Sequence, residues 1–166
     1  MSLLSGFCVP PIYEDYHALG LWYEKRNEID SAILIFSRLL LVCPDDNLGV
    51  RCILPALWFK KGDYLSVIRL CKKHEDDIIP EIIYGNPLAH LLMGENKKAE
   101  KLLQQAKKEL PLVAKELLKK RHRRPASEFP GFIASGGADQ AYEYWSQYGE
   151  FWKKCDKATE LLKKDL

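Results

Sequence analysis

The chain has 166 residues, of which 47% are hydrophobic and 29% charged, a composition typical of one ordinary folded domain. Its net charge of +2 is too close to neutral to indicate nucleic acid or an anionic membrane as the main partner. Five scattered cysteines without a C-x-x-C pair argue against a zinc site or a redox motif and indicate a reducing cytoplasm.

The charge is unevenly distributed along the chain. Residues 1–83 carry 9 basic and 12 acidic side chains, a net charge of −3, whereas residues 84–166 carry 16 and 11, a net charge of +5. An electrostatic partner is therefore expected to meet the C-terminal half. The longest apolar stretch, Leu39–Cys43, is far too short to span a bilayer, so no membrane contact is expected.

Apolar residues recur at steps of three and four along nearly the whole chain, which predicts an all-α fold. Residues 12–111 contain three units, each a helix, a polar break and a second helix with a small residue early and a bulky one a turn later. These pairs are Ala32 and Phe36, Val67 and Cys71, and Ala99 and Leu103. The small residues are 35 and 32 positions apart, which indicates a helical repeat.

The segment Pro44–Phe59 combines helical spacing with two residues that disturb helices. Pro55 removes a backbone hydrogen bond, so a bend is expected there. Asp46 is one of three N-cap candidates, and Gly49 is expected to let another chain approach the first turn. Arg51 could clamp a carboxylate or phosphate of a ligand, or bond to Asp46; the sequence leaves both roles open and favours the second.

Residues 112–136 are expected to form a basic helix and a linker rich in proline and glycine. The run Lys119–Arg124, with Lys115 one turn earlier, is the densest positive segment of the chain. It could contact phosphates or an acidic protein, or it could be a solvated helix end. No aromatic residue interrupts the run, so the stacking signature of single-strand binders is missing.

Residues 137–166 are expected to form an aromatic C-terminal helix. Its apolar stripe consists of Ala141, Trp145, Tyr148, Trp152 and Cys155. The stripe either caps the final hairpin or forms an interface that enters the groove of its own chain or of a neighbouring copy, which would give a homodimer. Trp145, Tyr148 and Trp152 are the candidate interface residues.

The first unit resembles the tetratricopeptide repeat. The residues that carry the likeness are Tyr16 (where the family has Trp), Leu19, Gly20, Tyr23, Ala32, Phe36 and Pro44. The resemblance implies an α–α superhelix of about three hairpins with a C-terminal capping helix, here as a single domain over residues 1–166. The stretch Pro44–Arg51 also resembles poorly characterised bacterial tetratricopeptide-like proteins, some of which carry a SEC-C metal motif. This chain has no Cys-rich tail, so no metal function carries over.

The two resemblances imply a concave groove for a helix or extended peptide of a protein partner. Its positions on this chain are His17, Leu21, Glu24, Asn47, Arg51, Cys52, Ile53, Ala56, Phe59, Lys60, Tyr84 and Leu88. Most of these side chains are apolar, so burial is expected to give affinity. Glu24 and Lys60 are expected to set the register of the partner.

Enzyme signatures are missing from the sequence: it has no G-x-x-x-x-G-K-[ST], G-x-S-x-G or H-E-x-x-H motif. Cys71 and His74 share a helix face, but one such pair does not make a metal site. We therefore expect a non-enzymatic cytoplasmic adaptor or assembly subunit without metal or cofactor. The alternative is a nucleic-acid-associated factor, whose cations would be Lys115, Lys119, Arg121, Arg123 and Arg124.

Overall fold

The computed structural model describes residues 10–126 and 133–164, and every regular element in these ranges is a helix. The predicted all-α class is thereby confirmed. Contacts divide the chain into two compact units, unit 1 up to Lys61 and unit 2 from Gly62 onward, where the sequence indicated a single domain. Within the described ranges, no helix is long and apolar enough to cross a membrane.

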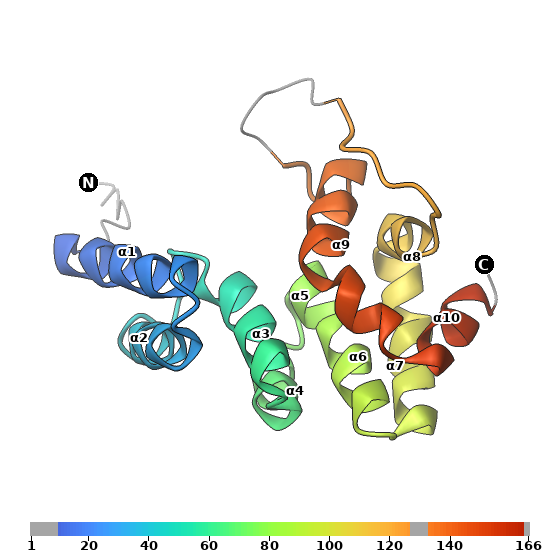
Figure 1. Cartoon of the computed structure of the whole chain (residues 1–166), viewed down its shortest axis with the longest axis horizontal. Helices are drawn as coiled ribbons and strands as arrows, with labels where there is room; N and C mark the ends of the chain where they lie inside the picture. The colour runs from blue at the N-terminus through green and yellow to red at the C-terminus, as the bar shows by residue number, and fades with distance from the viewer. Residues whose placement is uncertain (1–9, 127–132, 165–166) are drawn as a thin grey trace, which may run out of the picture. The chain divides into compact units, whose positions relative to one another are not determined.

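Unit 1 contains α1 (Pro11–Lys25), α2 (Ile29–Val42) and α3 (Val50–Lys61). α1 begins with a proline, whose fixed φ suits the first helical position. Asn27 adopts a φ of 60° in the turn between α1 and α2, a conformation that asparagine tolerates better than most residues. The two helices consequently fold back on each other as a hairpin (Figure 1).

The α1–α2 hairpin depends on a very close contact between a glycine and an aromatic ring. Gly20 is buried in α1, and a Cβ atom built on it would lie 2.6 Å from Cε1 of Phe36 in α2. Only a residue without a side chain lets the backbone approach the ring this closely. Ala32 and Phe36 are both fully buried, and so are the corresponding pairs of the other two units.

A buried carboxylate starts α3. Asp46, four residues before the helix, accepts hydrogen bonds from the backbone N–H of Val50 at 2.7 Å and of Arg51 at 2.8 Å, two of the N–H groups that the first turn leaves without a helical partner. Gly49 has a φ of +70°, and no described atom lies within 4 Å of where its Cβ would be. Its positive φ is a backbone conformation that favours glycine, and the close approach of another chain stays a prediction. α3 continues through the buried Pro55 to Lys61.

Unit 2 contains seven helices in the described ranges. They are α4 (Tyr64–Lys73), α5 (Pro80–Ile83), α6 (Gly85–Leu92), α7 (Asn96–Glu109), α8 (Pro111–Leu117), α9 (Ala138–Lys153) and α10 (Asp156–Lys163). Packing places α6 against both α4 and α7, and α9 against α8 (Figure 1). α8 ends at Leu117, so the basic run that follows is not helical, contrary to the expected basic helix.

An aromatic cluster forms the core of unit 2. Tyr144 stacks on Tyr148 with ring centroids 4.5 Å apart, and Trp152 donates from Nε1 to the hydroxyl of Tyr144 at 3.1 Å. Tyr84, the N-cap residue of α6, contacts both Tyr144 and Trp152. Its hydroxyl donates to the carbonyl of Leu110 at 2.9 Å. The hydroxyls of Tyr84 and Tyr144 and the indole N–H of Trp152 thus have partners, as burial favours.

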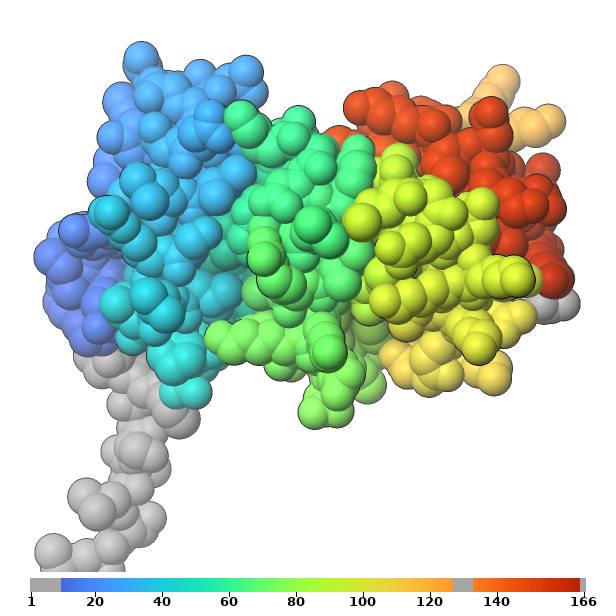
Figure 2. Space-filling view, turned by 90° about the horizontal axis from the view of Figure 1, so that it is seen from below, coloured from blue at the N-terminus to red at the C-terminus, as the bar shows by residue number. Residues whose placement is uncertain are grey.

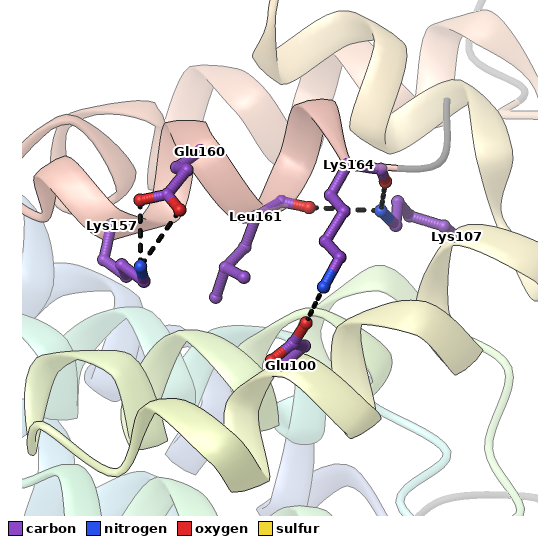
Figure 3. A network of polar contacts seen from close by, with 6 residues as sticks. All are labelled: Glu100, Lys107, Lys157, Glu160, Leu161 and Lys164. Atoms are coloured by element: carbon purple, nitrogen blue, oxygen red, sulfur yellow. Dashed lines mark hydrogen bonds and ion pairs between the residues drawn. The ribbon is translucent and has the colours of Figure 1, made fainter.

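The expected single C-terminal helix is in fact two helices, with the break at Lys154 and Cys155. α10 turns back along α7, where its apolar face, which includes Leu161, is buried. Figure 3 shows the polar contacts that hold it: Lys107 of α7 donates to the carbonyls of Leu161, at 3.1 Å, and of Lys164. This burial and these hydrogen bonds favour the break over a straight helix.

Candidate functional site

The predicted groove residues are divided between the two units, so each set is described within its own unit. In unit 1, Leu21, Asn47 and Lys60 are exposed, His17, Glu24, Arg51, Cys52 and Ile53 are half-buried, and Ala56 and Phe59 are buried. Lys60 Nζ lies 3.7 Å from Glu24 Oε1, so these two charges pair with each other. In unit 2, Tyr84 and Leu88 are fully buried core residues.

Arg51 has the structural role that the sequence favoured. Its Nε donates to Oδ2 of Asp46 at 2.9 Å, and the Asp46 side chain is only 2% exposed. The carboxylate therefore accepts bonds from two backbone N–H groups and one guanidinium. Such a charge-assisted arrangement fixes the start of α3.

The predicted interface residues lie against the body of unit 2. Tyr148 and Trp152 are buried in the aromatic core, and Trp145 is half-buried. The first two side chains are therefore occupied within the chain and do not form an exposed stripe. Trp152 contacts Tyr84, one of the predicted groove residues, so this helix packs on its own chain.

The basic segment, Lys115–Arg124, is anchored by a buried carboxylate. Glu116 is 2% exposed and pairs with Nζ of Lys119 and with Nδ1 of His122, the latter at 2.9 Å. Arg124 pairs with Glu143 of α9. Lys119 and His122 thus bind back to Glu116 at the end of α8, and Arg124 ties the segment to α9.

The basic segment also meets an aromatic residue that follows it by more than twenty positions. The ring of His122 stacks on the indole of Trp145, with centroids 3.6 Å apart and planes at 7°. Tyr142 lies next to the same indole at 5.4 Å. The segment therefore has aromatic neighbours, although none interrupts it in sequence.

A cavity of about 420 Å³ opens in unit 2 between α4 and α7, over α5 and α6. Helices α4 (green) and α6 and α7 (yellow-green) lie side by side on the face seen in Figure 2. Its apolar lining consists of Ile68, Cys71, Ile82, Ile83, Leu102 and Ala106, and its polar lining of Lys72, Glu75, Asn86, His90, Lys98, Gln105 and Glu109. None of these side chains was among the predicted binding residues.

Burial changes the protonation of several groups in and near this cavity. It raises the pKa of the Cys71 thiol to about 12 and that of the Glu81 carboxyl to about 7. Burial also lowers the pKa of His90, helped by the nearby charge of Lys98. The Cys71 thiol is therefore unreactive at neutral pH, and His90 is neutral. No group of three His, Cys, Asp or Glu side chains in the described ranges is placed to hold a metal ion.

Comparison with protein families places the chain. A model of the family described as transcriptional repressor TCF25 matches residues 23–157. The chain belongs to the Tcf25 family. No curated protein and no solved structure matches the chain.

Membership of the Tcf25 family corrects the family assignment made from sequence. The tetratricopeptide resemblance and the bacterial one are both wrong as assignments, because the matching family is Tcf25. Their cause is physical: Gly20, Ala32 and Phe36, which carried part of the likeness, are buried where α1 and α2 pack. Any pair of closely packed antiparallel helices needs small and bulky residues at its contact. The pattern therefore indicates helix packing and does not identify a family.

Tcf25 membership also changes the expected partners of the chain. A family described as a transcriptional repressor does not support the prediction that nucleic acid is an unlikely partner. That prediction rested on the near-neutral net charge of the whole chain, whereas the cations concentrate in the basic segment.

Proposed function

We propose that this Tcf25-family chain is a non-enzymatic, transcription-related factor that contacts nucleic-acid phosphates through its basic segment. The family description supports a role in transcription and a nuclear rather than a cytoplasmic location. The observation that carries the proposal is a difference among the cations of the basic segment: some form ion pairs with carboxylates of unit 2, and others face solvent.

The solvent-facing cations are Lys115, Lys120, Arg121 and Arg123. All four are exposed, and none has an ion-pair partner among the described residues. Lys119 and His122, by contrast, are bound to Glu116. Because the anchored side chains alternate with the free ones, the free cations project from an ordered backbone. Ordered Lys and Arg side chains suit phosphate contacts, which are independent of base sequence.

Salt dependence of binding tests the proposal. Fluorescence anisotropy would measure the affinity of the full chain for a labelled DNA duplex and for a single-stranded RNA of equal length. With four phosphate contacts, log K should fall with log salt with a slope of about −3 to −4. Undetectable binding to both probes at low salt would overturn the proposal.

A pair of charge-matched variants makes the test specific. Replacing Lys120, Arg121 and Arg123 by Gln should weaken binding at least about tenfold and reduce the slope by about 3. The control replaces three exposed lysines of α7, namely Lys97, Lys101 and Lys108, by Gln and removes the same charge. Equal losses in both variants would show a nonspecific charge effect and would reject the basic segment as the site.

Protein binding is the second candidate function, because unit 2 contains the cavity between α4 and α7. Its lining mixes apolar and charged side chains, and none of them belongs to the basic segment. A factor of this family could therefore bind nucleic acid and a protein through different surfaces.

A further inference from the structure

We propose that the cavity of unit 2 binds a short extended peptide segment of a protein partner. An aliphatic side chain of the peptide would be seated against Ile82, Ile83 and Leu102, and an N–H group would donate to Asn86. The inference does not depend on nucleic-acid binding by the basic segment.

Asn86, one of the residues that line the cavity, carries a polar atom that needs a donor. Oδ1 of Asn86 is buried and has no hydrogen-bond partner among the described residues. An unsatisfied buried acceptor costs about 1–3 kcal/mol, so a ligand that donates to it gains that amount over one that does not. A purely apolar ligand would leave Oδ1 of Asn86 without a donor and would not gain this free energy.

A second acceptor lies one helical turn further along α6. Nδ1 of His90 lies 2.8 Å from Oε2 of Glu95, so the proton of the neutral ring belongs on Nδ1. Nε2 of His90 is then an acceptor, and His90 lines the cavity four residues after Asn86. Two acceptors on one helix face fit the donors of a peptide, since its backbone supplies N–H groups at regular intervals.

The charges around the cavity have both signs. Lys72 comes from α4 and Glu75 from the turn after it, and Lys98 and Glu109 come from α7. A polyanion such as nucleic acid would be repelled by the two carboxylates, and a simple cation would be repelled by the two lysines. A peptide with one acidic and one basic side chain matches both signs.

Helix directions place opposite charges at opposite ends of the cavity. α6 runs antiparallel to α7, because Tyr84 bonds to Leu110 and His90 bonds to Glu95. Glu109 therefore lies at the end near Tyr84, and Lys98 lies at the end near His90. The two residues are eleven positions apart in α7, or about 16 Å along the helix.

The separation of Lys98 and Glu109 sets the length of the peptide. Five extended residues span at most about 17 Å, so the long side chains at the two ends can reach both charges. The fitting sequence has an acidic residue at one end, an aliphatic residue at the centre and a basic residue at the other end. We choose as probes the capped pentapeptide Ac-Glu-Ala-Leu-Ala-Lys-NH₂ and the same sequence in reverse order, since either chain direction could fit.

Methyl NMR of the full chain tests the inference. Titration with the two probes up to millimolar concentration should give saturable shifts for the methyl groups of Ile68, Ile82, Ile83 and Leu102 with at least one direction. Replacing the central leucine of the probe by serine should weaken binding about tenfold or more, because aliphatic burial is lost. The absence of saturable shifts with both probes, or shifts spread over the whole chain, would overturn the inference.

Variants of two asparagines give the matched control. Asn86→Leu removes the buried acceptor and should weaken peptide binding about tenfold, whereas Asn96→Leu at the exposed start of α7 should leave it unchanged. Equal binding by the wild type and Asn86→Leu would reject the role of Asn86. The Gln variants of Lys120, Arg121 and Arg123 should bind the peptide normally, so failure of nucleic-acid binding and failure of peptide binding are separable. If a single-stranded RNA shifted the same methyl groups, the peptide assignment would be wrong.

Discussion

Each unit is held together by contacts among its own helices, and these contacts span different distances in sequence in the two units. Unit 1 closes through the contact of Gly20 with Phe36 and through a hydrogen bond from Lys61 to Asp30, 31 positions apart. In unit 2, Lys107 reaches Leu161 over 54 positions, and Lys164 reaches Glu100 over 64 (Figure 3). Unit 1 therefore depends on hairpin geometry, whereas unit 2 depends on the return of its last two helices.

The units also differ in their buried polar chemistry. In unit 1, the buried Asp46 carboxylate has three donors and behaves as an ordinary cap. In unit 2, burial shifts the pKa of Cys71, Glu81 and His90 away from their ordinary values. We therefore expect unit 2 to respond to pH and to ligands, and unit 1 to respond chiefly to changes in packing.

The largest expected effect comes from removing the aromatic core of unit 2. Trp152→Ala deletes a side chain that is 3% exposed and also its hydrogen bond to Tyr144, so the free energy of unfolding of unit 2 should fall by about 3–5 kcal/mol. Hydrogen exchange followed by mass spectrometry would report each unit separately. Protection should be lost in α9 and α6 and retained in α1 and α2.

An exposed tryptophan gives the control for that change. Trp22 of α1 is 50% exposed, so Trp22→Ala should cost less than about 1 kcal/mol. If Trp152→Ala removed protection equally from both units, the two units would not be stabilised separately, and the comparison between them would fail.

The next effect tests the hairpin of unit 1. Alanine is normally the better helix residue, yet Gly20→Ala should destabilise unit 1 by about 2–3 kcal/mol, because its Cβ would overlap the buried ring of Phe36. Urea unfolding would measure the change. Combining the variant with Phe36→Leu should recover part of the loss, and simple additivity of the two changes would refute the contact as the cause.

The sequence predicted those features of the fold that arise from local spacing. Three- and four-residue periodicity gave the all-α class, and the start of the last long helix at Ala138 agrees with α9. The small residue Ala32 and the bulky Phe36 are indeed core residues. Each of these features depends on neighbours within one or two turns or within one hairpin.

Contacts between segments that are far apart along the chain could not be predicted from the sequence. Nothing in the spacing indicates that α10 turns back onto Lys107, or that Trp145 receives the ring of His122. The cavity was missed for the same reason, since its walls come from four helices whose packing the sequence does not specify. The family was misassigned because helix packing, not function, sets the residues that were compared.

A pH-dependent effect should appear in unit 2 and not in unit 1. The pKa of Glu81 rises from an ordinary 4.5 to about 7 on folding, so the folded state holds the proton more tightly than the unfolded one. The resulting stabilisation is present below pH 4.5 and is lost as the pH rises to 7. The full pKa shift corresponds to a change of about 3 kcal/mol in the free energy of unfolding. Because Glu81 is half-buried, we expect a change of about 2 kcal/mol.

The Glu81→Gln variant isolates that effect. Glutamine keeps the shape of the side chain and does not titrate, so the stability of the variant should fall less than that of the wild type between pH 4.5 and 7.5. Urea unfolding at both pH values would measure the difference. Parallel pH profiles for the two proteins would show that Glu81 is not the titrating group.

The smallest effect concerns the cap of α3 in unit 1. Asp46→Ala removes the acceptor of two backbone N–H groups and the partner of Arg51, and it places alanine at a φ of 51°, so we expect a loss of about 1–2 kcal/mol. Asp46→Asn keeps one acceptor and tolerates this φ better, and should cost less than half as much. A larger loss for Asn than for Ala would mean that the charge on Asp46, and not its capping geometry, stabilises α3.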